Sequence, residues 1–122
     1  MNKLSYIILD DDQAFCLWLE AKIRLNVPNF KLIASYHTTL EGILAISREK
    51  PDVLFLDMNI DGLNGIDVLE LMKYEPATII ISSASKNALD FKDNTNIHAF
   101  LKKPFTVEEL QSEAEKLTKK IT

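Results

Sequence analysis

Five short apolar runs, separated by segments with helical spacing, constrain the fold of this chain more than any other feature. The runs are Leu4–Leu9, Phe30–Tyr36, Asp52–Asp57, Ala77–Ser83 and His98–Lys102. Each has the length of a strand, and the first, third and fourth are almost continuously apolar, which is typical of strands covered on both faces. This alternation predicts an α/β fold, a three-layer sandwich in which helices flank a five-stranded parallel sheet.

The segments between these runs carry apolar residues at three- and four-residue steps, which predicts amphipathic helices. A shorter and more polar segment, Asn87–Asp93, is predicted as a further helix, so five helices are expected. The apolar faces expected to point inward are Phe15, Leu19 and Ile23; Leu40, Ile43 and Leu44; Val68, Leu69 and Met72; and Val107, Leu110, Ala114, Leu117 and Ile121.

Hydroxyl and amide side chains mark where these helices begin, because they can accept hydrogen bonds from the free N–H groups of a first turn. Thr38 or Thr39 is expected to cap the second helix, and Asn64 the third. Thr106 with Glu109 has the spacing of a capping box at the start of the last helix.

Length and charge exclude several classes of protein. The 122 residues suit one domain, which we expect to span residues 1–122. Eighteen acidic and fourteen basic side chains give a net charge of −4, which disfavours direct nucleic-acid binding. Cys16 has no partner for an internal disulfide and is expected in the core. The sequence shows no membrane span or signal peptide, so we expect a cytoplasmic protein without membrane contact.

Polar side chains follow four of the predicted strands, where a parallel sheet gathers its carboxyl ends at one edge. Three carboxylates near one another repel by roughly 4 kcal/mol per pair at 4 Å and an effective dielectric constant of 20, so a cation or protons must offset the charge. Oxygen ligands suit Mg²⁺, and a lysine beside a hydroxyl suits a phosphoryl group. The residues at the strand ends are Asp10, Asp11 and Asp12; Asp57; Ser82 and Ser83; and Lys102, Lys103 and Pro104.

Four motifs in this order, "ILDD", "LFLDMN", "IIISSA" and "LKKPF", resemble the response-regulator receiver domain of two-component signalling. The resemblance covers essentially the whole chain, and each motif lies at the end of a predicted strand. It implies a CheY-like, flavodoxin-like topology with strand order 2-1-3-4-5.

The resemblance also implies roles for the acidic residues. Asp57 matches the phosphoacceptor, which forms an aspartyl-phosphate in this family. Asp10 and Asp11 match the acid pair that holds Mg²⁺, Asp11 as a direct ligand and Asp10 through water. Asp57 itself and the backbone carbonyl of Asn59 are the further ligands that the family would supply.

Three more positions match the family's switching residues. Ser83 matches the hydroxyl residue and Lys103 the lysine that pairs with the phosphoryl group. The bond from Lys103 to Pro104 is expected to be cis, as in the family. Phe100 matches the aromatic residue whose rotamer changes on activation.

The sequence departs from the family pattern after the phosphoacceptor. Asp61 stands where the family often has proline, although Gly65 occupies its expected place. Asp61 is therefore expected to add a charge near the site and to affect the metal loop or dephosphorylation. The stretch between Ser83 and Lys103 is also slightly short for the family.

The implied function is that of a phosphorylation switch. A sensor histidine kinase or a phosphotransfer protein would donate the phosphoryl group to Asp57 with Mg²⁺ bound, and autodephosphorylation would reset the domain. Self-phosphorylation and this reset are the only catalytic chemistry expected. The resemblance leaves the downstream effector unnamed and allows a homodimer through the fourth helix, fifth strand and last helix.

Other interpretations of the same residues remain open. Asp10 and Asp12 form an Asp-x-Asp that resembles the haloacid-dehalogenase signature, in which Asp10 would be the nucleophile of a phosphohydrolase; Gln13 and the short chain disfavour it. Asp12 alone is explained as a helix cap. A binding module that keeps the receiver shape without phosphorylation is a third interpretation. A flavin site is disfavoured, because "DDDQ" would repel a phosphate.

Overall fold

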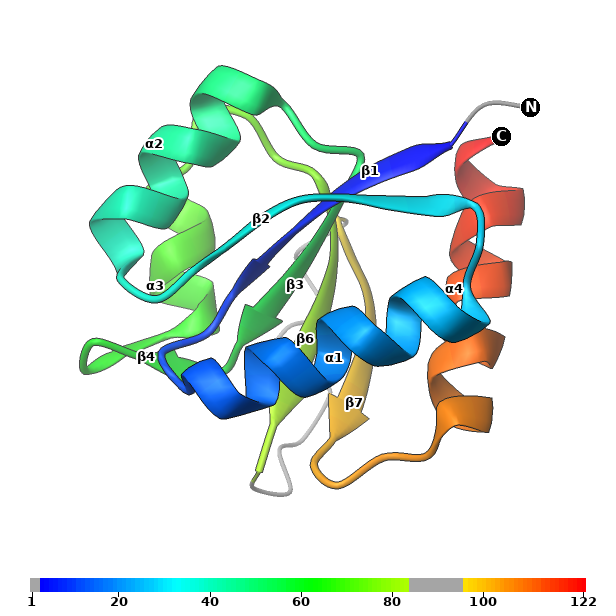
Figure 1. The fold of residues 1–122 in the computed structure, drawn as a ribbon. Coiled ribbons are helices and arrows are strands. Elements are labelled where there is room, and N and C mark those ends of the chain that lie inside the picture. The colour runs from blue at the N-terminus through cyan, green and yellow to red at the C-terminus, as the bar shows by residue number, and fades with distance from the viewer. Residues whose placement is uncertain (1–2, 84–95) are drawn as a thin grey trace.

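A computed structural model describes residues 3–83 and 96–122 of the chain and has three layers (Figure 1). Within these residues a central sheet carries two helices on each face, and helices flank a five-stranded parallel sheet as predicted. The first and last of these helices cover one face, and the second and third cover the other. The helices are α1 (Gln13–Asn26), α2 (Thr39–Glu49), α3 (Gly65–Glu70) and α4 (Val107–Ile121).

The number of helices differs from the expected five because Asn87–Asp93 lies outside the described residues. The caps of the described helices agree with the sequence. Thr38 is the N-cap of α2, and both Asn64 and Thr106 form capping boxes at α3 and α4. Asp12 caps α1, with its side chain accepting from the N–H of Phe15.

The central sheet has the predicted topology. Its strands are all parallel and lie in the order β2-β1-β3-β6-β7, which is 2-1-3-4-5 when these five are counted along the chain. A separate antiparallel pair, β4 with β5, follows β3 and was not predicted. The strands are β1 (Leu4–Leu9), β2 (Phe30–Tyr36), β3 (Val53–Asp57), β4 (Asn59–Ile60), β5 (Leu63–Asn64), β6 (Ala77–Ser82) and β7 (Ile97–Lys102).

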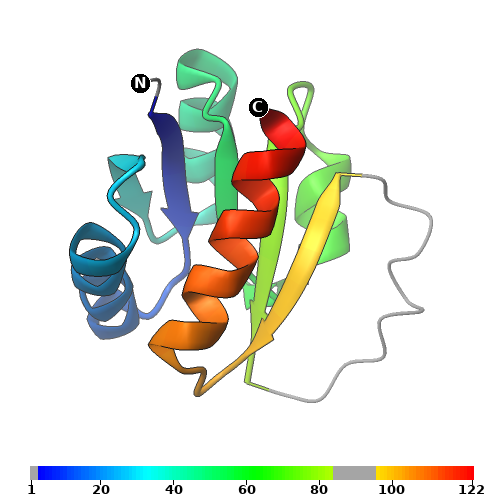
Figure 2. The ribbon, with the colours of Figure 1, turned by 90° about the vertical axis from the view of Figure 1, so that its right-hand side faces the viewer.

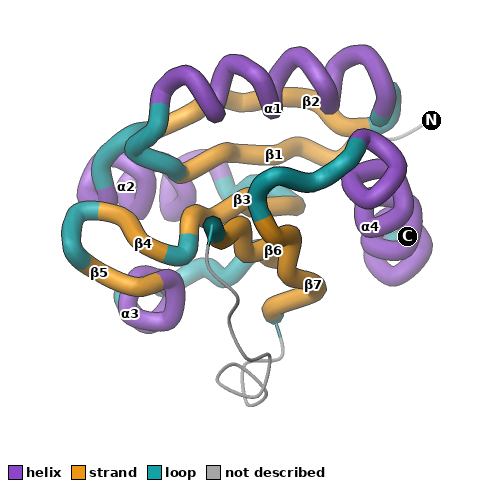
Figure 3. Tube along the Cα trace, turned by 90° about the horizontal axis from the view of Figure 1, so that it is seen from below, coloured by secondary structure: helices purple, strands orange, loops and turns teal. Residues whose placement is uncertain are grey.

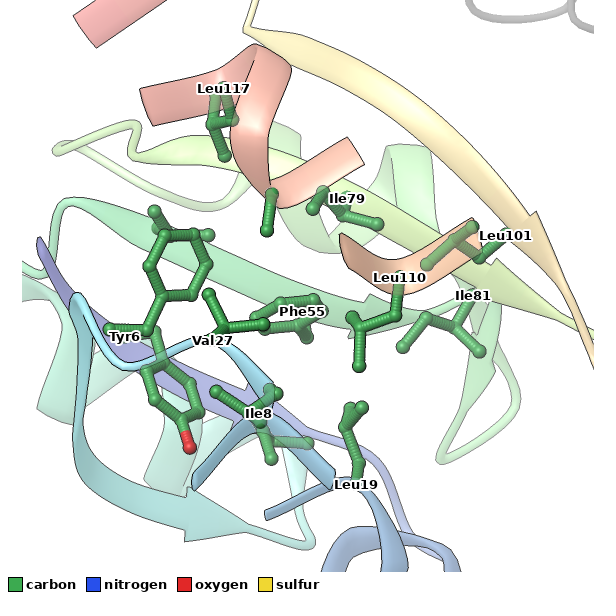
Figure 4. Packing of buried hydrophobic residues seen from close by; sticks show 14 of the residues in the cluster. Tyr6, Ile8, Leu19, Val27, Phe55, Ile79, Ile81, Leu101, Leu110 and Leu117 are labelled. Atoms are coloured by element: carbon green, nitrogen blue, oxygen red, sulfur yellow. The ribbon is translucent and has the colours of Figure 1, made fainter. Parts of the chain in front are cut away.

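The first core cluster fills the space between the sheet and the helices α1 and α4. Tyr6 belongs to this cluster and packs edge-to-face on Phe55, with ring centroids 5.7 Å apart. Figure 4 shows Leu110 and Leu117 of α4 pointing down onto this face of the sheet. Cys16 lies in the same cluster, as expected for a small core residue. Because apolar side chains of helix and strand meet here, this cluster fixes α1 against the sheet.

The second core cluster, under α2 and α3, corrects one prediction. Leu40 and Leu44 were expected to point inward, but they are 69% and 58% exposed. The residues that α2 buries are Thr39, Gly42, Ala45 and Ile46. A Cβ atom on Gly42 would lie 2.6 Å from Leu9 Cδ1, so the helix approaches β1 through its small residues. That close approach turns the two leucines toward solvent.

The carboxyl ends of the sheet strands lie at one edge, which Figure 3 views from below. The loops that follow β1, β3 and β7 meet there, between α1 and the β4–β5 hairpin. Both chain termini lie at the opposite edge, and α4 runs back along the sheet beside β7 (Figure 2). Within residues 3–83 and 96–122, no helix is both long and apolar enough to cross a lipid bilayer.

Candidate phosphoacceptor and metal site

The sheet register brings Asp10, Asp57 and Lys103 to one face of the carboxyl edge. Asp57 ends β3, and its partner on β6 is Ile81 of the first core cluster. Asp10 follows the core residue Ile8 by two positions, and Lys103 follows Leu101 by two. Because side chains two apart on a strand share a face, the three polar groups continue the apolar face beneath α1 and α4.

Asp10 is the most deeply buried of these groups, with 1% of its surface exposed. Its Oδ2 atom lies 3.0 Å from Lys103 Nζ, and its Oδ1 atom accepts a hydrogen bond of 2.9 Å from the N–H of Asp12. The buried charge is therefore paired and hydrogen-bonded, as a buried carboxylate must be. This pair ties the loop after β1 to the loop after β7.

Asp10, Asp11 and Asp57 form a three-carboxylate cluster, in which one oxygen of each lies within 4.8 Å of the others. Burial, and then the charge of Asp10, raises the pKa of Asp57 to about 7. Lys103 and the N–H of Asn59, 3.4 Å from Asp57 Oδ1, act in the opposite direction without cancelling this rise. The surroundings of Asp57 thus disfavour its ionised form, chiefly because burial removes the carboxylate from water.

This donor set fits a hard divalent cation. Carboxylate oxygens at such separations are the ligands that Mg²⁺ takes in proteins, usually one or two of them together with water. Asp11 is exposed and Asp57 is half-buried, so solvent reaches the side where a hydrated ion would enter. Asn59, the fourth predicted ligand, begins β4 directly beside Asp57.

The loop after Asp57 turns sharply at Asp61, the residue that stands where the family often has proline. Asp61 and Gly62 both have positive φ, 53° and 77°, as the two central residues of a type I′ hairpin turn require. The Asp61 carboxylate accepts a hydrogen bond of 2.6 Å from the N–H of Thr39 in the first turn of α2. Asp61 therefore neutralises a helix N-terminus, and it is not a member of the three-carboxylate cluster.

Ser83 and Phe100 lie where the sequence predicted them, at the end of β6 and within β7. Ser83 directly follows β6 and is exposed at the same edge of the sheet. The preceding residue, Ser82, accepts a hydrogen bond of 2.7 Å from the N–H of Lys103, which joins the ends of β6 and β7. The Lys103–Pro104 bond is cis, as predicted. Phe100 is half-buried against the second core cluster.

From the sequence, Phe15 was predicted only as part of the apolar face of α1. In the structure Lys103 Nζ lies 4.0 Å from the centroid of the Phe15 ring, in a cation–π contact. Trp18 and Phe105 pack against the same ring. The spacing of Phe15 along α1 matches its helix period and carries no signal for this contact, which joins residues far apart in the chain.

Comparison with known proteins agrees with this geometry. Residues 6–115 match the family model described as the response regulator receiver domain. A nitrate/nitrite response regulator protein homolog from Haemophilus influenzae is 31% identical over 86 residues, which cover 69% of this chain and 41% of that protein. A response regulatory protein from Vibrio cholerae is 28% identical over 117 residues, covering 93% of this chain and 48% of that protein.

Solved structures show the same fold. The response regulator domain of CheB from Thermotoga maritima is 25% identical, with a TM-score of 0.72 over 98% of this chain and 94% of that one. The receiver domain of NarL from Mycobacterium tuberculosis has a TM-score of 0.82 at 19% identity, over 98% of each chain.

The chain belongs to the response regulator receiver domain family of two-component signalling. Receiver domains are phosphoacceptor switches that bind Mg²⁺ in an acidic pocket, and the cluster of Asp10, Asp11 and Asp57 lies where this pocket is expected. The chain spans less than half the length of these two relatives.

Proposed function

We propose that Asp57 accepts a phosphoryl group from a phosphohistidine of a sensor kinase or phosphotransfer protein, and that this modification switches a partner-binding face. The observation that carries the proposal is the cluster itself. A half-buried carboxylate lies among two other acids, with the Lys103 ammonium held at its edge by Asp10. Repulsion between these carboxylates lowers the stability of the unphosphorylated protein. A phosphorylation site is a functional reason to keep such an arrangement.

In the transfer step, a carboxylate oxygen of Asp57 attacks the phosphorus while the bond from phosphorus to the imidazole nitrogen breaks. The bonding electron pair stays with the imidazole nitrogen. The ring leaves as neutral imidazole, either because its other nitrogen already carries a proton or because it takes one up from solvent. The Lys103 ammonium and the Ser83 hydroxyl would then donate hydrogen bonds to the phosphoryl oxygens. Hydrolysis reverses the modification, because water attacks the phosphorus, the bond to Asp57 breaks and inorganic phosphate leaves.

Magnesium would be held by Asp11 and Asp57, by Asp10 through water and by the backbone carbonyl of Asn59. When bound, the ion would neutralise charge on the carboxylates and on the phosphoryl oxygens. The raised pKa of Asp57 supports this assignment, because burial and the charge of Asp10 disfavour its ionised form and a bound cation would favour it. Lys103 would exchange its contact with Asp10 for one with the phosphoryl group.

The switch would reach the partner-binding face through β7. Lys103 directly follows this strand, and Phe100 lies within it, half-buried against the second core cluster. A shift of Lys103 toward the phosphoryl group would therefore move the strand end and bias the Phe100 rotamer. Residues 1–122 would act as one receiver unit in the cytoplasm, passing the signal to an effector or to a second copy of the chain.

The direct test is incubation with phosphoramidate and Mg²⁺, followed by intact-mass measurement. We expect wild type to gain one phosphoryl group and Asp57→Asn to gain none. Glu70→Gln, an exposed carboxylate on α3, serves as the matched control and should be modified at the wild-type rate. An unmodified wild type, or an adduct that persists in Asp57→Asn, would refute the proposal.

A separate turnover assay distinguishes the phosphohydrolase interpretation. In that interpretation Asp10 is the nucleophile, but it is almost fully buried and its Oδ2 atom is paired with Lys103. Asp12, the second acid of the signature, is used as the cap of α1. Turnover of a phosphomonoester that survives Asp57→Asn and is lost in Asp10→Asn would favour the hydrolase instead.

A further inference from the structure

The contacts of Lys103 are of two different kinds. Its ammonium pairs with Asp10 Oδ2 at 3.0 Å and lies over the face of Phe15, 4.0 Å from the ring centroid. The Lys103 side chain is 21% exposed, so part of it still faces solvent. Asp10 and Phe15 therefore hold the ammonium from two sides, and the remaining side can accept a further partner.

The Phe15 ring is itself held in place by its surroundings. Its backbone N–H donates a hydrogen bond of 3.0 Å to Asp12 Oδ1, the cap of α1, which fixes the start of the helix. The ring meets Phe105 edge-to-face, with centroids 6.1 Å apart, and lies 5.8 Å from the Trp18 ring. Phe105 is buried, so the far side of this aromatic cluster is anchored in the core.

A ring face suits an ammonium that must later move. The π-system attracts the cation, but it has no lone pairs that could compete with a phosphoryl oxygen for the N–H donors of lysine. A carboxylate at the same place would bind the ammonium more tightly and would compete. An aliphatic side chain would leave the long lysine stem tethered only at Asp10 and free to sample solvent.

The geometry points to Phe15 as a positioning residue, which holds the Lys103 ammonium beside the acidic cluster so that it meets the phosphoryl group arriving at Asp57. This inference rests on the proposed function. The role that it assigns to Phe15 depends on the π electrons of the ring and not on the size of the side chain. The electron density of the ring can be changed while its size stays nearly constant.

The experiment replaces Phe15 with phenylalanines carrying one, two and three ring fluorines, which weaken the π face at nearly constant shape. The second-order rate constant for phosphorylation by phosphoramidate with Mg²⁺ is measured by intact mass. We expect the rate to fall at each step. Phe15→Leu should lower it about threefold to tenfold, the factor that corresponds to loss of a partly exposed cation–π contact.

Two controls separate positioning from packing. Phe15→Trp keeps a π face and should stay within about twofold of wild type. Leu17→Ala removes an exposed neighbour on α1 and should leave the rate unchanged. Thermal unfolding of each variant reports whether it folds. In a Lys103→Met background, whose rate is already low, Phe15→Leu should cause no further loss.

A second readout needs no phosphorylation. The ε-methylene protons of Lys103 should resonate upfield in wild type, because they lie near the ring, and should return to ordinary shifts in Phe15→Leu. Two results would overturn the inference and leave the proposed function intact, provided that wild type is phosphorylated. One is a phosphorylation rate that does not change with the number of ring fluorines at Phe15. The other is a loss of rate in Phe15→Leu that is equally large in the wild-type and Lys103→Met backgrounds. A wild type that takes up no phosphoryl group would overturn both.

Discussion

Asp10 and Asp57 are both carboxylates of the acidic cluster, yet the fold compensates their charges differently. Asp10 has the Lys103 ammonium and the N–H of Asp12 as partners, at 3.0 and 2.9 Å. Asp57 has the N–H of Asn59, at 3.4 Å, and a more distant attraction to Lys103. Burial of Asp57, and then the charge of Asp10, raises its pKa to about 7, and these weaker contacts do not cancel the rise.

The raised pKa of Asp57 makes the stability of the metal-free protein depend on pH. The folded state binds the Asp57 proton more tightly than the unfolded chain, where the ordinary pKa is 3.8. Stability therefore falls as the pH rises from about 4 through about 7. Asp57→Asn removes this effect, so at about pH 8 with EDTA we expect it to be more stable than wild type by about 1–2 kcal/mol, after allowing for solvent screening.

Urea unfolding at several pH values measures the difference. Glu70→Gln, an exposed carboxylate, should follow the wild-type curve throughout. A gap between wild type and Asp57→Asn that stays constant from about pH 4 to about pH 8 would show that folding does not raise the pKa of Asp57.

At the scale of elements, α2 depends on close approach to the sheet and on a hydrogen bond from the neighbouring hairpin. Gly42 lets the helix approach Leu9, and Asp61 in the β4–β5 turn accepts from the first turn of the helix. The loop that carries Asn59 is thereby fastened to α2. The stability of the helix and the position of the expected metal loop are therefore linked.

Gly42→Val tests the close approach. The added side chain meets the fully buried Leu9, which cannot move away without disturbing β1. We expect a loss of about 2–3 kcal/mol in the free energy of unfolding. Leu44→Val, on the exposed face, should change it by about 0.5 kcal/mol or less. A larger loss in Leu44→Val than in Gly42→Val would instead support the prediction that Leu40 and Leu44 point inward.

Asp61→Ala tests the hairpin contact. It removes the acceptor for the Thr39 N–H and places alanine at a positive φ, so we expect a loss of about 2 kcal/mol. Asp61→Asn tolerates the same backbone and keeps an oxygen acceptor, and it should lose less than half as much. Thermal or urea unfolding distinguishes them, and equal losses would show that the contact contributes nothing specific.

At the scale of the whole molecule, the two core clusters hold the sheet from both faces, and the polar cluster is confined to one edge. The ends of β1, β3 and β7 all contribute to that edge, so a ligand bound there connects loops from distant parts of the chain. Binding to the folded state alone stabilises the entire domain, because the unfolded chain does not assemble these carboxylates.

Magnesium should therefore raise the global unfolding midpoint. At a free concentration about one hundred times Kd, the expected gain is about 2.7 kcal/mol. Asp11→Asn, at an exposed position, should keep the metal-free stability and lose this gain. Urea unfolding across a magnesium titration, with potassium chloride matched for ionic strength, provides the measurement. A gain of equal size in Asp11→Asn would place the ion elsewhere.

Local pattern was sufficient for the elements and for the order of the site motifs. The run Leu4–Leu9 predicted a buried strand, and Thr106 with Glu109 marked a helix start without reference to anything distant. Asp10, Asp57 and Lys103 could be expected together because each directly follows or ends a strand of a parallel sheet. Such signals lie within a few residues of one another, where periodicity and hydrogen-bond chemistry act directly.

Tertiary structure alone decided which face of α2 points inward, where the Asp61 carboxylate binds and what lies above Lys103. Apolar periodicity suggested Leu40 and Leu44, but the distance between helix and sheet favoured Gly42. The Phe15–Lys103 contact likewise joins the start of α1 to the loop after β7. The physical reason is the same in each case, because a side chain's own neighbours in sequence do not determine which distant element packs against it.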